Sequence, residues 1–268
     1  MLVLLLIIQG WNLLERSVSV VKLSDDSKFT HKITEGRNRY SIIRAMGVKN
    51  LIVEVYEKVK GVNVTVPFKR DVIPFLDDLS KEANITQSVN TIFFKNNKIT
   101  GHNTDIAGFQ ISLKDTEFNL NNKKVLILGS GGVVPSIIYA LEKSGVSQIT
   151  ICNRTKSKAI ELKKTFSNLK IVEWGMVPEF DMIINATSLG LDKNDKIDLN
   201  FTNINKNKFF YDVIYNPKET NFLQIGKNLG AQILNGKKMF IYQASEAFKL
   251  WHNINPEIND EVLKLLDQ

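Results

Sequence analysis

A glycine-rich turn between an apolar run and a helical pattern offers phosphate-binding chemistry. It follows the apolar residues Val125–Leu128 and precedes a helical segment that Pro135 opens. Glycine permits a tight turn and lets backbone N–H groups approach a pyrophosphate, whose charge the helix dipole stabilises. Val134 stands where the full dinucleotide-binding fingerprint has its third glycine, so the turn alone leaves an ordinary strand–turn–helix connection as an equal alternative. The residues of the predicted site are Gly129, Ser130, Gly131, Gly132 and Val133.

The residues that follow the next predicted strand, Gln148–Cys152, indicate which dinucleotide would bind. A site for NAD usually has an acidic residue there, which grips the ribose 2′-hydroxyl. A guanidinium can instead grip a 2′-phosphate through two charge-assisted hydrogen bonds, whereas an acid would repel it. The alternative is an exposed turn rich in lysine, but the glycine turn at the right distance favours NADP as the cofactor. The side chains found there are neutral or cationic: Asn153, Arg154, Thr155, Lys156 and Lys158.

Two further stretches carry residues that could move a proton. Lys69 ends the polar stretch Asn63–Lys69, and Asp105 stands at what looks like a helix start within His102–Phe109. Taken alone, Lys69 is one of 35 basic residues. Asp105, behind Thr104, has the place of an ordinary acid in the first turn of a helix. The residue types alone therefore give neither of them a catalytic role.

The elements that must position these groups alternate between strand and helix. Short apolar runs predict buried strands, and longer segments with helical periodicity predict helices. This alternation favours a mostly parallel sheet with helices on both faces. The segment 194–207, rich in Asn, Lys and Asp, is predicted to be a surface loop. The predicted strands are Leu2–Ile8, Val62–Val66, Val125–Leu128, Gln148–Cys152, Met182–Ile184 and Phe209–Val213. The predicted helices are Pro135–Leu141, Lys156–Phe166, Glu219–Leu229, Ala244–Trp251 and Glu257–Leu266.

Composition narrows the class of protein. The 268 residues are 43% hydrophobic and 24% charged, which predicts a globular chain of about two domains rather than a disordered one. The single cysteine, Cys152, excludes an intramolecular disulfide and fits a reducing compartment, so a cytoplasmic location is expected. The longest apolar opening, Leu2–Ile8, is too short to span a bilayer, and no membrane association is expected. The net charge is +7, but the lysines are scattered, so nucleic-acid binding is not expected.

Eight motifs in order and in register resemble the shikimate dehydrogenase family. They cover the chain from Gly61 to about Trp251, and each alone is weakly specific. The motifs are N-V-T-V-P-F-K at 63–69, V-N-T at 89–91, N-T-D-I-A-G-F at 103–109, G-S-G-G at 129–132, N-R-T at 153–155, N-A-T-S-L-G at 185–190, D-V-I-Y-N-P-K-E-T at 212–220 and Q-A-S-E-A-F-K-L-W at 243–251.

The resemblance implies NADPH-dependent reduction of 3-dehydroshikimate to shikimate, a step toward chorismate and the aromatic amino acids. It implies that Lys69 is the catalytic lysine and Asp105 its partner. Such a pair suits a reaction in which a hydroxyl proton leaves or returns as hydride moves. The implied substrate ligands are Ser17, Ser19, Thr65, Asn90, Asp105, Tyr215 and Gln243. The implied cofactor contacts add Thr187, Ser188, Val213 and Gly236 to the glycine turn and to Asn153, Arg154, Thr155 and Lys158.

Ordinary structural roles remain as alternatives for some of these residues. Asn90 and Thr65 would satisfy loop backbone groups, and Gln243 would cap a following helix. The three histidines are isolated, so no metal site is expected.

The first 50 residues depart from the family pattern. Members carry H-S-x-S-P-x-x-H-N, whose two serines hold the substrate carboxylate, and Ser17 and Ser19 keep only the S-x-S spacing. Loss of both prolines of the family's segment removes two fixed φ angles that would preset the loop. Arg16 could itself pair with a carboxylate. The residues that replace the family's Pro, His, Pro, His and Asn are Leu13, Arg16, Val20, Ser24 and Asp25.

We therefore expect two α/β domains. A substrate domain of residues 1–104 plus 236–268 is completed by C-terminal helices, and a Rossmann-like NADP-binding domain of residues 105–235 is inserted into it. A homodimer is compatible with the sequence. Two alternatives remain: a catalytically impaired NADP-binding relative with a decayed carboxylate loop, and a dehydrogenase acting on quinate or a related acid.

Overall fold

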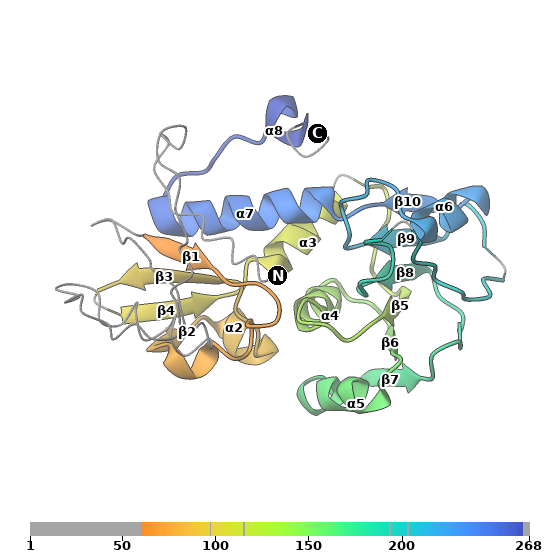
Figure 1. Cartoon of the computed structure of the whole chain (residues 1–268), viewed down its shortest axis with the longest axis horizontal. Coiled ribbons are helices and arrows are strands. Elements are labelled where there is room, and N and C mark those ends of the chain that lie inside the picture. Colours follow the sequence, from red (N-terminus) through yellow and green to blue (C-terminus); the bar gives the residue numbers. More distant parts are fainter. Residues whose placement is uncertain (1–59, 97, 115, 193, 203, 265–268) are drawn as a thin grey trace, which may run out of the picture. The chain divides into compact units, whose positions relative to one another are not determined.

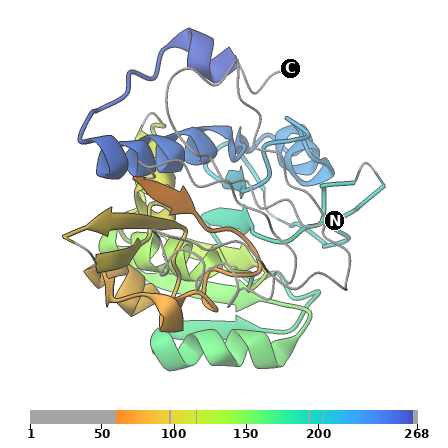
Figure 2. The same ribbon diagram turned by 60° about the vertical axis from the view of Figure 1, so that its left-hand side comes forward.

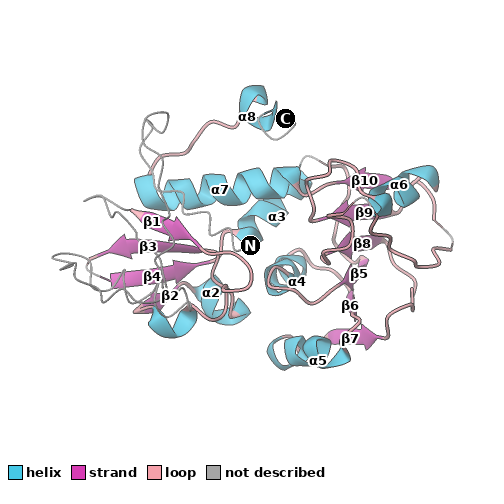
Figure 3. Cartoon of the chain, in the orientation of Figure 1, coloured by secondary structure: helices cyan, strands magenta, loops and turns pink. Residues whose placement is uncertain are grey.

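The computed structural model describes residues 60–264 except 97, 115, 193 and 203. The predicted strand Leu2–Ile8 and the candidate ligands Ser17 and Ser19 lie outside the described residues. Two compact units divide the chain between Asn103 and Thr104. Each has a sheet of its own, shown by ribbons in Figure 1 and by element type in Figure 3. No helix in the described part of the chain is long and apolar enough to cross a membrane.

The second unit is built on a six-stranded parallel sheet. Its spatial order is β10-β9-β8-β5-β6-β7. If the six strands are numbered 1 to 6 along the chain from β5 to β10, the order read from β7 to β10 is 3-2-1-4-5-6, as in dinucleotide-binding α/β sheets. The direction in which successive strands are added to the sheet reverses between β5 and β8. The parallel α/β class predicted from the alternating pattern is thereby confirmed. The strands are β5 (Lys124–Leu128), β6 (Gln148–Cys152), β7 (Leu169–Val172), β8 (Met182–Asn185), β9 (Phe209–Asp212) and β10 (Gln232–Leu234).

Alternate residues of each central strand enter two different cores. Val125 and Ile127 of β5 pack with the helices on one face, whereas Leu126 and Leu128 pack on the other. The first face is covered by α3, α4 and α5, and the second by α6 (Figure 3). Because both faces are covered, the strands read as continuous apolar runs in the sequence. The helices are α3 (Asp105–Lys114), α4 (Val134–Lys143), α5 (Lys156–Thr165), α6 (Asn221–Asn228), α7 (Lys237–His252) and α8 (Asp260–Lys264).

Helices α3 and α7 cross in direct contact. A Cβ added to Gly108 would lie 2.7 Å from the Met239 carbonyl oxygen, so only glycine allows this approach. The two helices stay side by side in both views (Figure 1 and Figure 2). The sequence predicted α7 only from Ala244, and its first two turns, from Lys237, were missed. Which functional domain α7 serves stays a prediction.

The first unit holds a four-stranded mixed sheet in the order β1-β3-β4-β2. Strands β1 and β4 are antiparallel to β3, and β2 is parallel to β4. A small core of Val64, Val72, Ala83, Val89, Ile92 and Ile99 supports the sheet. Its elements are β1 (Gly61–Asn63), a 3₁₀ turn η1 (Ile73–Phe75), β2 (Asp78–Leu79), α2 (Lys81–Thr86), β3 (Thr91–Lys95) and β4 (Lys98–His102). Most of these short elements lack a sequence signal and were not predicted.

Two predictions need correction. The strand predicted over Val62–Val66 ends at Asn63, because the chain turns at Thr65, where the Phe68 N–H donates to the Thr65 carbonyl oxygen at 2.9 Å. The segment 194–207 has no helix or strand among its described residues, but it is not wholly on the surface. Ile197 and Leu199 are buried against the sheet face that carries α6, because that face has apolar area left to cover.

Candidate functional site

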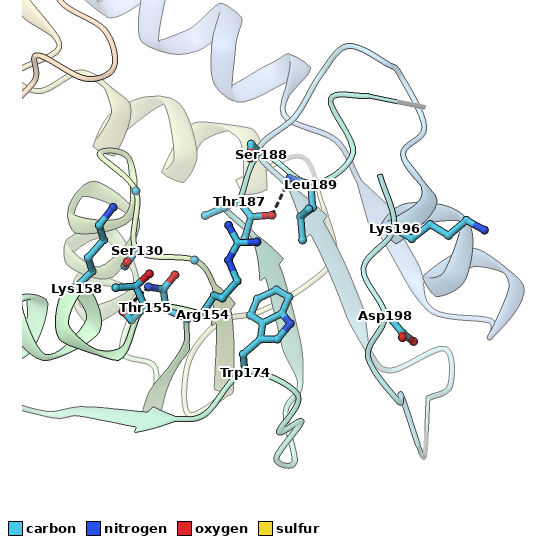
Figure 4. Close-up of a pocket in the computed structure, with 14 residues that line it drawn as sticks. Ser130, Arg154, Thr155, Lys158, Trp174, Thr187, Ser188, Leu189, Lys196 and Asp198 are labelled. Atoms are coloured by element: carbon cyan, nitrogen blue, oxygen red, sulfur yellow. Dashed lines mark hydrogen bonds between the residues drawn. The ribbon is translucent and has the colours of Figure 1, made fainter. Parts of the chain in front are cut away.

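A cavity of about 440 Å³ opens at the point where the winding of the parallel sheet reverses. The residues that follow β5 and those that follow β8 form its two central walls. Open α/β sheets bind their ligands at this place, beyond the carboxyl ends of the strands. Figure 4 shows the lining side chains, which come from several loops at this edge of the sheet. The position alone therefore makes this cavity the candidate site for a dinucleotide.

The glycine turn forms the first wall of the cavity. Gly129 has a φ of +105°, and an added Cβ would lie 2.8 Å from the Ala186 carbonyl oxygen. The Gly129 N–H donates to the Cys152 carbonyl oxygen at 2.9 Å, which ties the turn to the end of β6. Helix α4 begins at Val134, with Pro135 in its first turn. A glycine-lined turn at a helix N-terminus suits a phosphate, so the residues present fit the expected pyrophosphate.

Cationic side chains border the second part of the cavity. Arg154, from the loop after β6, and Lys158, from the first turn of α5, are exposed and line it (Figure 4). Lys196 adds a third positive charge, and Asp198 contributes one negative charge. Trp174, just after β7, offers a half-buried aromatic surface in the same wall. A ribose phosphate and a flat base would both find suitable partners here.

The turn after β8 forms the remaining wall, and its hydrogen bonds are made internally. The Thr187 hydroxyl donates to the Asn185 side-chain oxygen at 2.7 Å and accepts from the Leu189 N–H at 3.0 Å. The Thr187 methyl group would lie 3.1 Å from a Cβ at Gly129, so it packs beside the glycine turn. Beneath this turn, burial raises the pKa of the Asp212 carboxyl to about 6. The hydroxyl of Thr187 thus shapes the turn.

Most of the predicted cofactor residues come together in this cavity. Those that line it are Gly129, Ser130, Gly131, Asn153, Arg154, Thr155, Lys158, Thr187 and Ser188. Gly132, Val133, Val213 and Gly236 do not line it. Val213 and Gly236 pack on each other elsewhere in the unit: a Cβ at Gly236 would lie 2.1 Å from the Val213 carbonyl oxygen. Their contact with the cofactor stays a prediction.

Five lining residues were not predicted from the sequence: Trp174, Ala186, Leu189, Lys196 and Asp198. Trp174 follows β7, which is not among the predicted strands. Had that strand been identified, an aromatic residue at its carboxyl end would have been a candidate. Lys196 and Asp198 belong to the segment predicted as a surface loop, and no signal distinguishes them from other charged loop residues.

Three candidate residues gather at one end of the first unit's sheet. The last residue of β1, Asn63, pairs with the first of β3, Thr91, and this in turn pairs with the last of β4, His102. Asn90 lies at this end, where its carbonyl oxygen accepts from the Val64 N–H at 2.7 Å. Lys69 joins it, because its carbonyl oxygen accepts from the Val89 N–H at 2.8 Å.

The side chains at this end of the sheet differ in exposure. Lys69 and Asn90 are 9% and 3% exposed, whereas Thr65 is exposed. A lysine that has so little contact with water is unusual and is often a functional group. The first unit therefore places Lys69 and Asn90 at one end of its sheet, with Thr65 next to Val64 in the chain, and their role as substrate and proton-transfer residues stays a prediction.

The second unit carries the other candidates on α3, on α7 and after β9. Asp105 begins α3 and is 6% exposed. Gln243 lies within α7, where its side-chain amide donates to the Phe240 carbonyl oxygen at 2.8 Å, so it does not cap a following helix. The Tyr215 ring stacks on Phe240, with 4.6 Å between the centroids. The pairing of Asp105 with Lys69 across the two units stays a prediction.

The described residues contain no group of three or more His, Cys, Asp or Glu side chains that could hold a metal ion. The expectation that the reaction uses no metal stays a prediction.

Two family models match the chain. The model described as "Shikimate dehydrogenase substrate binding domain" matches residues 31–92. The model described as "Shikimate / quinate 5-dehydrogenase" matches residues 111–218. The first match includes Thr65, Lys69 and Asn90, and the second includes strands β5 to β9 of the parallel sheet.

Named relatives are similar over most of the chain. A shikimate dehydrogenase (NADP(+)) of Pelagibacter ubique is 59% identical over 211 residues, which are 79% of this chain and 80% of the relative. A crystal structure of shikimate dehydrogenase from Aquifex aeolicus has a TM-score of 0.70 at 36% identity, covering 86% of this chain and 91% of that one. The Thermus thermophilus shikimate 5-dehydrogenase, solved with NADP(H) and shikimate, has a TM-score of 0.70 at 27% identity, covering 85% and 91%.

Proposed function

The chain belongs to the shikimate dehydrogenase family, and we propose that it catalyses the reversible, NADPH-dependent reduction of 3-dehydroshikimate to shikimate. The observation that carries this proposal is the cavity at the sheet's reversal point, which joins a glycine turn to Arg154 and Lys158. NADPH, when bound, supplies the hydride. The remaining chemistry falls to the chain: binding two anions, orienting a polyol and moving one proton.

The chain holds the dinucleotide with backbone on one side and cations on the other. The turn at Gly129–Gly132 receives the pyrophosphate, since it lines the cavity just before the N-terminus of α4. Arg154 and Lys158 receive the 2′-phosphate that distinguishes NADP from NAD. Residues 152–158 carry no acidic side chain that would repel this phosphate. NADP is therefore favoured over NAD.

Lys69 and Asp105 move the proton. In reduction, the Lys69 ammonium returns a proton to the substrate oxygen as the carbonyl becomes an alcohol. In oxidation, the neutral amine takes the hydroxyl proton. Asp105 holds the lysine in position and binds the same region of the ring. The scarce exposure of both side chains supports this role, because a water-poor site strengthens the interaction of each with substrate.

Hydrogen-bonding side chains select the substrate. Thr65, Asn90, Tyr215 and Gln243 bind its hydroxyl groups, and Ser17 and Ser19 bind its carboxylate. A site that hydrogen-bonds each hydroxyl rejects an analogue that lacks one, because a buried polar group is then left without a partner. This selection predicts rejection of shikimate analogues that lack a ring hydroxyl. Quinate, whose ring is saturated and carries one more hydroxyl, is discriminated only through that added hydroxyl and the shape of its ring.

The partners of the chain are small molecules. We also propose that it acts in the cytoplasm, where a buried lone cysteine, Cys152, stays reduced, and that it forms a homodimer. Light scattering of the purified protein would give the mass of one chain or two.

A substrate panel tests the proposed function. Initial rates are measured with shikimate or quinate, each with NADP⁺ or NAD⁺, by following the absorbance of the reduced cofactor. The expected result is a kcat/KM for shikimate with NADP⁺ at least about tenfold above the other three combinations. Folded protein that binds NADP⁺ but oxidises neither acid would instead identify a catalytically impaired relative. A higher kcat/KM for quinate would make it a quinate dehydrogenase.

A further inference from the structure

A buried polar network lies directly beneath the turn that lines the cofactor cavity. Asn185, the last residue of β8, pairs in register with Asp212, the last residue of β9. Both are fully buried, and Thr220, which caps α6, is 2% exposed beside them. None of the three lines the cavity, so the proposed reaction gives none of them a role.

The Asp212 carboxylate accepts hydrogen bonds from three neutral donors. Its Oδ1 atom accepts from the Asn185 side-chain amide and from the Ile214 N–H, both at 3.0 Å. Its Oδ2 atom accepts from the Thr220 hydroxyl at 2.5 Å. An ionised carboxylate only accepts, so it fixes which side of each neighbouring group faces it.

Asn185 passes this constraint on to the turn. Its Nδ2 group donates to Asp212 and also to the Leu189 carbonyl oxygen at 3.0 Å. Its Oδ1 atom accepts from the Thr187 N–H at 3.1 Å and from the Thr187 hydroxyl at 2.7 Å. Turning the amide over would set Nδ2 against the Thr187 N–H and Oδ1 against both the carboxylate and the Leu189 carbonyl. The carboxylate and the Leu189 carbonyl both exclude this second orientation, because each would then face another acceptor, and the Thr187 N–H would face another donor.

We propose that Asp212 is a positioning residue for the dinucleotide: it fixes the orientation of the Asn185 amide, which holds the turn Thr187–Leu189 in the shape that lines the cofactor cavity. The same turn backs onto the glycine turn through the Thr187 methyl group and the Ala186 carbonyl oxygen. Both walls of the cavity therefore depend on one buried amide. This inference rests on the proposed function only in taking NADP as the ligand of the cavity.

The charge state of the network supports this role. The groups that face Asp212 from β8, from the loop after β9 and from the start of α6 are Asn185, Ile214 and Thr220, none of which is ionisable. Tyr211 is the titratable neighbour on the same strand. Burial and the charge of Asp212 raise the pKa of Tyr211, which keeps it neutral. Burial raises the pKa of Asp212 to about 6, so it is ionised at pH 8.

The test measures NADP⁺ affinity by isothermal titration calorimetry at pH 8 and pH 6. Asn185→Asp sets a second carboxylate against Asp212 and should raise the Kd about tenfold or more at pH 8. At pH 6 the pair shares a proton, which restores the donor, so the ratio of the variant Kd to the parent Kd should fall toward about threefold. Comparing each variant with the parent at the same pH cancels the titration of the cofactor's own phosphate.

Conservative variants separate positioning from general damage. Asp212→Asn keeps an acceptor for Asn185 and Ile214, and its amide can donate to Thr220, so its Kd should stay within about threefold of the parent. Thr187→Val removes the hydroxyl but keeps the packing and should raise the Kd about threefold to tenfold. Tyr211→Phe is the matched control: it lies next to Asp212 on β9, is equally buried, and bonds Ser112 instead of the turn. Its Kd should equal that of the parent.

The outcomes are distinct. Parent-like Kd values for Asn185→Asp and Thr187→Val, in protein whose circular dichroism matches the parent, would overturn the positioning role and leave the proposed function intact. An equal loss of affinity in Tyr211→Phe would also overturn it, by showing that any change in this core acts on the cavity. A parent that binds no NADP⁺ would refute the proposed cofactor and this role together. A parent that binds NADP⁺ but oxidises no shikimate would refute the function while the binding data still decide the role of Asp212.

Discussion

The two regions of this chain build their candidate sites from different parts of the polypeptide. In the second unit, the cofactor cavity is framed by strand ends, a glycine turn and a helix N-terminus, so much of its chemistry is backbone chemistry. In the first unit, the candidate residues are side chains on loops at one end of a small sheet, namely Thr65, Lys69 and Asn90. A backbone site tolerates many side-chain changes but few changes at its glycines. A site made from side chains depends on each of a few groups.

This difference predicts that the two regions respond to different perturbations. Changes in the first unit should alter turnover with little effect on cofactor affinity or stability. Changes at the cofactor cavity of the second unit should alter cofactor affinity or folding. Each of the following experiments tests that separation.

The largest effect is expected from Lys69→Ala. Loss of a proton acceptor of this kind typically lowers the rate by about a thousandfold, so kcat for shikimate oxidation should fall by about that factor. The NADP⁺ Kd should be unchanged, because Lys69 belongs to the first unit. The matched control is Lys98→Ala, an exposed lysine of β4, which should keep the parent rate. A comparable loss of NADP⁺ affinity in Lys69→Ala would break the separation between the two regions.

A smaller effect, on stability, is expected from Asp212→Asn. The folded state raises the pKa of Asp212 from 3.8 to about 6, so it holds a proton that the unfolded chain releases between about pH 4 and pH 6. The parent therefore loses stability as pH rises through this window, by up to about 3 kcal/mol at 1.4 kcal/mol per pKa unit. The variant has no such titration. Its unfolding free energy relative to the parent should rise by that amount from pH 4 to pH 7, as measured by urea unfolding.

The control for this experiment is Tyr211→Phe. Because burial raises the pKa of that tyrosine, it stays neutral throughout the window and its stability difference from the parent should be independent of pH. If the difference in unfolding free energy between Asp212→Asn and the parent were also independent of pH, the Asp212 carboxylate would not be desolvated as described.

Gly129→Ala should cost about 2 kcal/mol of unfolding free energy. Its φ of +105° and the 2.8 Å approach of the Ala186 carbonyl oxygen leave no room for a Cβ. Gly131→Ala offers a matched contrast, since the nearest atom to an added Cβ, again the Ala186 oxygen, lies at an ordinary 3.7 Å. That variant should keep its stability and lose only NADP⁺ affinity. Equal stabilities for the two variants would contradict the description of the turn.

The smallest effect is expected from Arg154→Ala. Removal of one phosphate contact should raise the KM for NADP⁺ about tenfold and leave the KM for NAD⁺ almost unchanged. Lys156→Ala is the control, because that lysine forms a surface ion pair with Glu173 and does not line the cavity. A similar rise with both cofactors would assign Arg154 to the part of the dinucleotide that NADP and NAD share.

The same contrast explains what could be predicted from the sequence. The glycine turn, the strands on either side of it and Arg154 follow one another within a few tens of residues, and local periodicity was enough to find them. Trp174 and Lys196 approach the same cavity only because β7 and a loop of no regular pattern bring them there. Lys69 gave no local signal, since its low exposure arises from packing that no short window of sequence contains. Its role came from resemblance.

The proposed reaction requires that Lys69 and Asp105, from different units, act on the same proton. The kcat/KM for shikimate should be measured for Lys69→Ala, for Asp105→Ala and for the double variant. If the two residues act as one, the double variant should lie within about tenfold of the slower single variant. A loss equal to the product of the two single losses would show that they act independently and would contradict the claim.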